Sequence, residues 1–406
     1  MNKKMVKIPD VLFFQEGPGV RNNQYTSNGV KLLNVANLVD GKVDLSTSDR
    51  YISENEAYGK YKHFLCDDGD FIVASSGIKV EYIDKKMGFV DKSMLPLCMN
   101  TSTIRFKVLN KEQLNIRYFM YYLKSRSFKS QLFKQITGSA QLNYGPSHLK
   151  RMYIPLLSID EQDYIVYFLD KIQTIIDLRK KQLVSLDKLV KARFVEIFGD
   201  AVTNPMKWPV KKLKDLAVQI NSGNTPKGGS ENYVDKGITF FRSQNVWKDR
   251  LEMNDIAYID PATHASMSRS SLKHGDILMT KTGRINTENS SLGRAAIYIG
   301  EDDKANVNGH VYFIRLKPEV NNKFVLRILV SSEYRNLIRS VCVGGIDKRQ
   351  LNKEHIEDFP IICPPSDMVD KYIAFVEQID KSKVAVQKAL DEAQLLFDSL
   401  MQEYFG

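Results

Sequence analysis

The stretches GDFIVASSG, residues 69–77, and GDILMTKTG, residues 275–283, share a pattern that decides how the rest of the chain is interpreted. Both begin with Gly-Asp, continue through an apolar run typical of a buried strand, and end on a glycine. They begin 206 residues apart, which raises the question whether the whole chain is a repeat.

Further matches extend this similarity in both directions. GVKLLNVANLV (29–39) aligns with GITFFRSQNVW (237–247) at a separation of 208 residues, and 148–199 aligns with 355–406 without a gap at 207. Small shifts across loops and a constant register near the end of each copy are what a duplication leaves. We therefore predict two tandem copies of one unit.

Each copy ends in a long predicted helix. Residues 160–198 contain neither proline nor glycine, and apolar residues recur there and in the second copy at heptad spacing. We expect the two apolar stripes to pack against each other, because a stripe about 39 residues long is unstable when exposed. Alternatively, each stripe packs only on its own domain, but such a helix spans about 58 Å, more than a domain of ~150 residues is wide. The predicted pairing residues are Ile165, Leu169, Ile172, Ile176, Leu183, Leu186, Val190, Tyr372, Val376, Ile379, Val386, Leu390 and Phe397.

The parts before the helices, roughly 1–155 and 205–363, have a mixed pattern. Short apolar runs such as DFIVAS, STIRFKVL and VYFIRL are bounded by Gly, Asn, Asp and Ser, as strands are, and helical stretches follow late in each copy. DAVTNPMKWP (200–209) reads as the connection between the first helix and the second domain. The expected fold class is α+β, with two tandem mixed domains, each followed by a long helix.

Composition narrows the protein class. The 406 residues are 43% hydrophobic and 26% charged, with no run of eighteen apolar residues and no signal-peptide pattern, so we expect a cytoplasmic protein with no membrane partner. The net charge of +10 favours a polyanionic partner. Four cysteines, without C-x-x-C pairing or nearby histidines, predict neither disulfides nor a metal site.

Catalytic motifs are missing from the sequence. We find no G-x-x-x-x-G-K-[ST], H-E-x-x-H or G-x-S-x-G, and no Asn-Pro-Pro-Tyr type motif of aminomethyltransferases. CPPS, at 363–366, has the prolines but neither the amide nor the aromatic residue. We therefore expect a non-catalytic chain without a cofactor or metal of its own.

Polar and basic residues follow the repeated strands. Arg and Asn or Gln can read guanine and adenine, while Lys, Ser and Thr contact phosphates. For any single residue, the competing interpretation is a solvated surface loop. Asn37 and Asn245 are equally suited to capping a turn, and the loop arginines could instead form surface ion pairs with Glu288 or Glu301. The candidate DNA-binding residues are Asn37, Ser75, Ser76, Lys79, Gln244, Asn245, Lys248, Arg250, Lys281, Thr282, Arg284, Asn286, Asn289 and Arg294.

Four features carry a family resemblance. They are SGNTPKGGSENYVDKGITFFRSQNV (222–246), the GDILMTKTG element, GSAQLN (138–143) before IPLLSIDEQ (154–162), and FGDAVTNPMKWPVKKLKDL (198–216). Together with the repeat, they resemble the DNA specificity subunit of type I restriction-modification systems over essentially the whole chain. The first copy departs from the S-G-x-T-P pattern with EGPGVRNNQYTSNG (16–29), and the second helix start reads CPPSDMV (363–369).

The resemblance implies two target-recognition domains, 1–158 and 201–365, and two spacer helices, 159–200 and 366–406, paired as an antiparallel coiled coil with pseudo-two-fold symmetry. Each domain would read one half of a bipartite, asymmetric sequence in double-stranded DNA. The helices would seat two methyltransferase subunits carrying S-adenosylmethionine, joined by restriction and motor subunits that use ATP and Mg²⁺. A spacer of about 58 Å corresponds to ~17 base pairs, so unread base pairs should separate the half-sites. The alternative is a stand-alone DNA-binding regulator built on the same scaffold.

Overall fold

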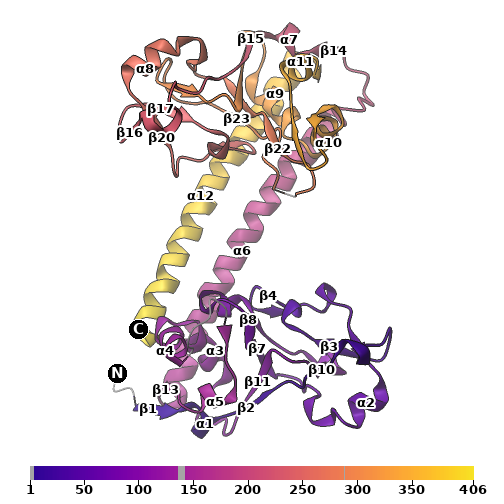
Figure 1. Ribbon diagram of the computed structural model, residues 1–406, viewed down its shortest axis with the longest axis vertical. Helices are drawn as coiled ribbons and strands as arrows, with labels where there is room; N and C mark the ends of the chain where they lie inside the picture. Colours follow the sequence, from indigo (N-terminus) through magenta and orange to yellow (C-terminus); the bar gives the residue numbers. More distant parts are fainter. Residues whose placement is uncertain (1–3, 136–141, 288) are drawn as a thin grey trace. The chain divides into compact units, whose positions relative to one another are not determined.

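The computed structural model describes residues 4–135, 142–287 and 289–406 (Figure 1). By packing, the chain forms two compact units: unit 1 contains residues 1–182 and 386–406, and unit 2 contains residues 183–385. Each unit therefore includes one globular domain, the near part of the helix that follows it, and the far part of the other helix. The four boundaries expected from the sequence remain a prediction, because packing divides each helix between the two units.

The same four-stranded antiparallel sheet forms the centre of each unit. The strand orders β2-β11-β7-β9 and β15-β25-β21-β23 are identical, and the Gly-Asp elements supply β7 and β21. All four residues of β7 and of β21 are buried, as their unbroken apolar runs predict. The strands are β2 (Leu12–Glu16), β11 (Thr103–Val108), β7 (Phe71–Ala74), β9 (Met87–Phe89), β15 (Ala217–Ser222), β25 (Val311–Leu316), β21 (Ile277–Thr280) and β23 (Ala295–Ile297).

In unit 1 the aspartate of the Gly-Asp element holds a buried arginine. Asp70 Oδ2 accepts a hydrogen bond from Arg105 Nη1 at 3.2 Å, and both side chains are buried. Arg105 on β11 also donates to Gln15 Oε1 on β2 at 2.5 Å, which ties three neighbouring strands together. Gly69 adopts φ +82°, a left-handed conformation that favours glycine at this turn.

Unit 2 repeats this network. Asp276 Oδ2 accepts from Arg315 Nη2 at 2.7 Å, and Arg315 Nη1 donates to Gln219 Oε1 at 3.2 Å. Gly275 has φ +88°. The repeated Gly-Asp pair is therefore a structural element, in which glycine makes the turn and aspartate neutralises an arginine inside the sheet.

Another glycine is shared although its sequence context differs. A Cβ on Gly17 would lie 2.0 Å from the Asn100 carbonyl oxygen, and one on Gly223 would lie 1.9 Å from that of Val307. Gly17 follows β2 as Gly223 follows β15, so the first copy keeps the glycine of the S-G-x-T-P element while losing its polar residues.

Smaller sheets and short helices complete each domain, and the arrangement is again largely repeated. One small sheet of unit 2 has four strands, β16, β20, β17 and β24, where the described residues of unit 1 form three. β22 pairs with the hairpin of β27 and β26, and β8 pairs with β12, which directly follows residues outside the described part of the chain. The unit 1 strands are β1 (Lys4–Lys7) with β13 (Tyr153–Leu156), β10 (Leu97–Met99) with β3 (Val30–Leu33) and β6 (Tyr51–Ile52), β4 (Leu38–Val39) with β5 (Lys42–Val43), and β12 (Leu142–Asn143) with β8 (Ser76–Ile78). The unit 2 strands are β14 (Val210–Lys212) with β28 (Pro360–Ile362), β16 (Tyr233–Val234), β20 (Ala257–Ile259), β17 (Ile238–Phe241) and β24 (Ala305–Val307), β18 (Val246–Trp247) with β19 (Arg250–Leu251), and β22 (Thr282–Arg284) with β27 (Lys348–Gln350) and β26 (Val343–Gly344). The helices before the long ones are α1 (Ile8–Val11), α2 (Glu54–Tyr58), α3 (Ile116–Lys124), α4 (Arg126–Gln135), α5 (Pro146–Leu149), α7 (Leu213–Leu216), α8 (Pro261–Ser266), α9 (Asn322–Leu329), α10 (Ser332–Val341) and α11 (Lys353–Glu357).

The long helices are α6 (Ile159–Phe198) and α12 (Ser366–Phe405), and in each unit the start of one lies beside the end of the other (Figure 1). In unit 2 the Tyr372 hydroxyl donates to the Val190 carbonyl oxygen at 3.4 Å, and Lys383 pairs with Asp187 at 2.6 Å. The antiparallel pairing is confirmed. Of the predicted pairing residues, ten are buried, while Leu183, Leu186 and Ile379 are half-buried.

The helix ends also pack on the domains, so the two packing alternatives combine. In unit 2, the Phe194 ring lies 5.8 Å from Phe324 of α9 and 5.6 Å from Tyr372 of α12. In unit 1, the ring of Phe405 lies 5.1 Å from Tyr118 of α3. Each domain is therefore seated on the start of its own helix and on the end of the other.

The four cysteines are free, and three of them are buried. Burial raises the pKa of the Cys66 thiol to about 12, which leaves it a neutral core side chain. No helix in the described part of the chain is both long and apolar enough to span a bilayer.

Candidate nucleic-acid interface

The loop between β22 and β23 in unit 2 was the main site predicted from the sequence. Arg294 stacks its guanidinium over the Trp247 ring at 3.9 Å and donates from Nε to the Ser290 carbonyl oxygen at 3.0 Å. Arg294 Nη2 also donates to the carbonyl oxygen of Asn289. Arg294 thus braces the loop and presents a half-buried cation beside an aromatic ring.

More basic side chains lie in the same part of unit 2 as this ring. We call Trp247, Lys248, Arg250, Arg294 and Arg335 the Trp247 cluster; the Arg250 guanidinium lies 5.4 Å from the Trp247 ring. Desolvation, together with the charges of Arg335 and Arg250, lowers the pKa of Arg294. The pKa of Lys248 is likewise lowered by desolvation and by Arg335. Cations that disfavour one another's charge in this way are stabilised by an arriving anion.

Acidic neighbours offset part of this charge. Arg250 Nε donates to Glu252 Oε1 at 2.6 Å, so this carboxylate offsets the charge of the guanidinium. The exposed candidate Gln244 is uncharged, and its Nε2 donates to Asp255 Oδ2 at 2.7 Å. Arg335 of α10 donates to the Thr287 carbonyl oxygen at 3.3 Å, which connects the helix to the loop.

Arg284 lies at the other end of the loop and is exposed. Its Nε lies 3.3 Å from Asp347 Oδ2, an acid not considered from the sequence, while the expected partner Glu288 lies outside the described residues. Lys281 is half-buried with Nζ 5.8 Å from the Tyr312 ring centroid, and Thr282 is also half-buried. Asn286 and Asn289 are exposed.

Two candidate asparagines are structural, which corrects their assignment as DNA contacts. Asn37 and Asn245 have no exposed surface. Asn37 Oδ1 accepts from the Asn34 backbone N–H at 2.9 Å, and Asn245 Oδ1 from that of Arg242 at 3.0 Å. Both side chains cap equivalent turns, so the turn-capping alternative applies to both.

In unit 1 the candidates are divided. Ser75 is buried, which corrects its assignment, and Ser76 Oγ donates to Ser102 Oγ at 2.6 Å. Lys79 is exposed and available to a ligand. The GSAQLN segment lies largely outside the described residues, since the structure omits 136–141.

A groove of about 1870 Å³ in unit 1 was not predicted. It is bordered by the domain and by parts of α6 and α12, and its basic residues outnumber its acidic ones. Desolvation lowers the pKa of Lys124 within it. Two of its cations are paired internally, Arg117 with Asp170 at 2.6 Å and Lys129 with Asp84 at 3.0 Å. The basic lining residues are Lys42, Lys85, Arg117, Lys124, Arg126, Lys129, Lys180 and Lys181.

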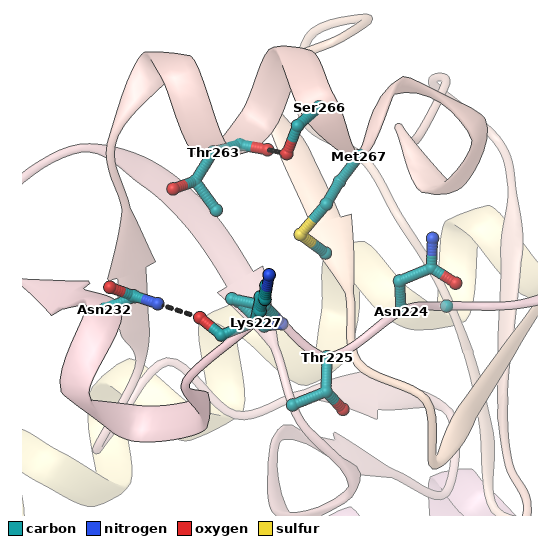
Figure 2. A pocket seen from close by; sticks show the side chains of 9 residues that line it. Asn224, Thr225, Lys227, Asn232, Thr263, Ser266 and Met267 are labelled. Carbon is teal, nitrogen blue, oxygen red and sulfur yellow. Dashed lines mark hydrogen bonds between the residues drawn. The ribbon is translucent and has the colours of Figure 1, made fainter.

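The SGNTPKGG segment forms a separate polar pocket of about 490 Å³ in unit 2 (Figure 2). Asn224, Thr225 and Lys227 lie on one side of this pocket, and Thr263 and Ser266 of α8 lie on the opposite side. The lining contains one cation and no acid–base pair, so its chemistry suits hydrogen bonding to a polar ligand rather than bond breaking.

The sequence interpretation missed Trp247 and Arg335. Trp247 ends the aligned stretch GITFFRSQNVW (237–247) and is followed by Lys248 and Arg250, and an aromatic residue among basic ones is a signal for nucleic-acid binding. Arg335 gave no such signal, because it lies on a helix about forty residues after the loop that it contacts.

In the described residues, no group of three or more His, Cys, Asp or Glu side chains is placed to hold a metal ion.

Comparison with known proteins gives one consistent family. The family model of the type I restriction modification DNA specificity domain matches residues 2–188 and again 205–393. In Methanocaldococcus jannaschii, the putative type I restriction enzyme MjaX specificity subunit is 23% identical over 402 residues, covering 89% of this chain and 86% of that protein. The MjaVIII specificity subunit of the same organism is 26% identical over 192 residues, and the match spans only 43% of its length and 46% of this chain.

Solved structures share the fold. The type I restriction-modification S subunit from M. genitalium superposes with a TM-score of 0.56 at 15% identity, covering 100% of this chain and 97% of that one. A chain from a study of complex assembly and conformational transition of the type I R-M system gives 0.55 at 16% identity, over 99% of this chain and 97% of that one.

Proposed function

Because the chain belongs to the type I restriction modification DNA specificity family, we propose that it reads a bipartite, asymmetric DNA target, one half with each domain. The observation that carries this proposal is a repeated scaffold with different loops. Both units hold the same Asp–Arg–Gln network under the same sheet, while the residues after β7 and after β21 differ in sequence and charge. Equal scaffolds place the two loops in equivalent positions, and unequal loops select unequal half-sites.

The partners follow from the family and from the helices. We propose that two methyltransferase subunits bind along α6 and α12 and that restriction and motor subunits join them. Large apolar side chains on the outer face of α6 support such a contact, since Tyr164, Tyr167 and Leu178 are each more than half exposed. S-adenosylmethionine, ATP and Mg²⁺ are assigned to these partners. This chain is then a non-catalytic, cytoplasmic subunit.

An exchange of one domain tests the bipartite model. Residues 205–363 are replaced by the equivalent region of another family member, and the methylated sequence is determined by methylation-sensitive sequencing of host DNA. We expect one half of the recognised sequence to change and the other to persist. A change in both halves or in neither contradicts the model, and a chain that purifies without methyltransferase subunits supports the stand-alone regulator.

A further inference from the structure

The hairpin formed by β26 and β27, residues 343–350, carries an unusual apolar tip. Ile346 is 90% exposed, more than any other large hydrophobic side chain in the described part of the chain. Val343 on the same hairpin is 42% exposed. Ile346 fills no core and Val343 is only partly covered, so burial within the domain does not explain an isoleucine at the tip.

The hairpin is held firmly, so the exposure of Ile346 is not the result of a loose end. β27 pairs with β22 in antiparallel register, with Arg284 opposite Lys348. The carbonyl oxygen of Asp347 accepts from the Ile285 backbone N–H at 3.0 Å, and Arg349 Nε donates to the Gly345 carbonyl oxygen at 3.2 Å. The tip is therefore pre-organised, which lowers the entropic cost of binding.

The surroundings of Ile346 are cationic. Lys348 and Arg284 are exposed on the paired strands, Arg349 is half-buried beside them, and Asp347 is their acidic neighbour. Arg335 of the Trp247 cluster donates to the Thr287 carbonyl oxygen in the loop that follows β22, the strand on which the hairpin is paired. An apolar tip inside a positive surface fits double-stranded DNA, which offers phosphates outside and apolar base surfaces, including thymine methyl groups, inside its grooves.

We propose that the β26–β27 hairpin is a DNA-reading element, in which Ile346 contacts base surfaces of one half-site while Lys348 and Arg284 bind the flanking phosphates. This inference rests on the proposed function of the chain. The hairpin was not among the residues singled out from the sequence, and it adds an apolar contact to what was expected to be polar recognition.

The test compares Ile346→Ser with Ile299→Ser, a matched control. Ile299 is 77% exposed in the same unit, on the loop between β23 and β24. Each variant is assembled with the methyltransferase subunits and titrated with the target duplex, identified beforehand by methylation sequencing, and with a scrambled duplex. Ile346→Ser should weaken target binding about tenfold, as loss of a base contact does, with an unchanged salt slope. Ile299→Ser should bind as wild type, and Lys348→Ala should reduce the salt slope by about one on both duplexes.

The outcomes distinguish failure of the proposed DNA-reading function from failure of the hairpin assignment alone. A wild-type complex that does not distinguish target from scrambled DNA refutes the proposed function and this inference with it. A wild-type complex that does distinguish them, combined with unchanged binding by Ile346→Ser, refutes only the inference. Failure of Ile346→Ser to assemble with methyltransferase subunits, while Ile299→Ser assembles, shows that the tip is a protein contact and also overturns it.

Discussion

Replacing Asp70 with Asn removes the negative charge from the buried Asp70–Arg105 pair and leaves the guanidinium in place. The side chains of Asp70 and Arg105 are only 3% and 6% exposed, so water cannot replace the lost partner. In the wild-type chain the Asp67 backbone N–H donates to Asp70 Oδ2 at 2.8 Å. The amide oxygen of the substituted asparagine can accept the same hydrogen bond, so the turn itself should survive.

The expected cost follows from the burial of this pair. Breaking a buried ion pair by removing one partner destabilises a domain by about 3–5 kcal/mol, because an uncompensated charge remains inside. The remaining acceptors of Arg105, which include the Leu65 carbonyl oxygen at 2.7 Å, are dipoles and compensate only part of that charge.

The second copy provides a matched comparison. In Asp276→Asn the partner left behind is Arg315, whose side chain is 25% exposed and can be hydrated in place. Burial raises the pKa of Asp276, so its charged form is already disfavoured in the folded protein. We expect Asp276→Asn to cost clearly less than Asp70→Asn.

Hydrogen exchange followed by mass spectrometry suits this comparison, because a chain with two units need not unfold in one step. Asp70→Asn should reduce amide protection of β7 and β11 by roughly two to four powers of ten, while β21 and β25 keep theirs. The exposed neighbour Asp68→Asn serves as the control and should change neither sheet. If protection in β7 and β11 stays at the wild-type level, the buried Asp70–Arg105 pair does not stabilise the sheet.

Three further predictions concern the helices, the loop and the effect of pH. The double variant Leu183→Asp, Leu186→Asp puts two charges into the helix seam, where a desolvated charge costs up to several kcal/mol and a half-buried one costs less. We expect it to lose assembly with methyltransferase subunits in pull-down assays, while the control Ser185→Asp, on the exposed face, assembles normally. Unchanged assembly of the double variant counts against the paired spacer. Arg284→Ala and Lys281→Ala should each reduce the salt slope of DNA binding by about one if these side chains contact phosphates. Arg294→Ala should weaken target binding by about 1–3 kcal/mol and relax specificity at a single base if Arg294 reads guanine. Wild-type values for all three variants in salt-dependent titrations exclude this loop from the interface. The hydrogen bond from Lys323 lowers the pKa of Glu377 below its ordinary value of 4.5, so the pair contributes its full stabilisation above that value and loses it as pH falls through the lower folded pKa. The difference in Tm between wild type and Glu377→Gln should therefore be present at neutral pH and vanish in strong acid. A difference that persists in strong acid refutes the assignment.

The sequence by itself determined the architecture of this protein. The repeat from 148–199 to 355–406, the absence of Pro and Gly from 160–198, and the heptad stripe are local patterns, and local patterns with a fixed period report secondary structure directly. Ten of the thirteen predicted seam positions are buried in the structure, and the two Gly-Asp stretches supply the central strands β7 and β21.

Tertiary structure decided which polar residues are available to DNA. Asn37 and Asn245 look like readers in the sequence, but contacts with turn residues bury them completely. Arg335 and Ile346 join the loop after β22 only because α10 and the β26–β27 hairpin fold back against it. Exposure and long-range contact depend on how distant segments pack, and no periodicity along the chain encodes them. The scaffold could therefore be predicted from the sequence, whereas the exposed residues of the interface depend on the tertiary fold.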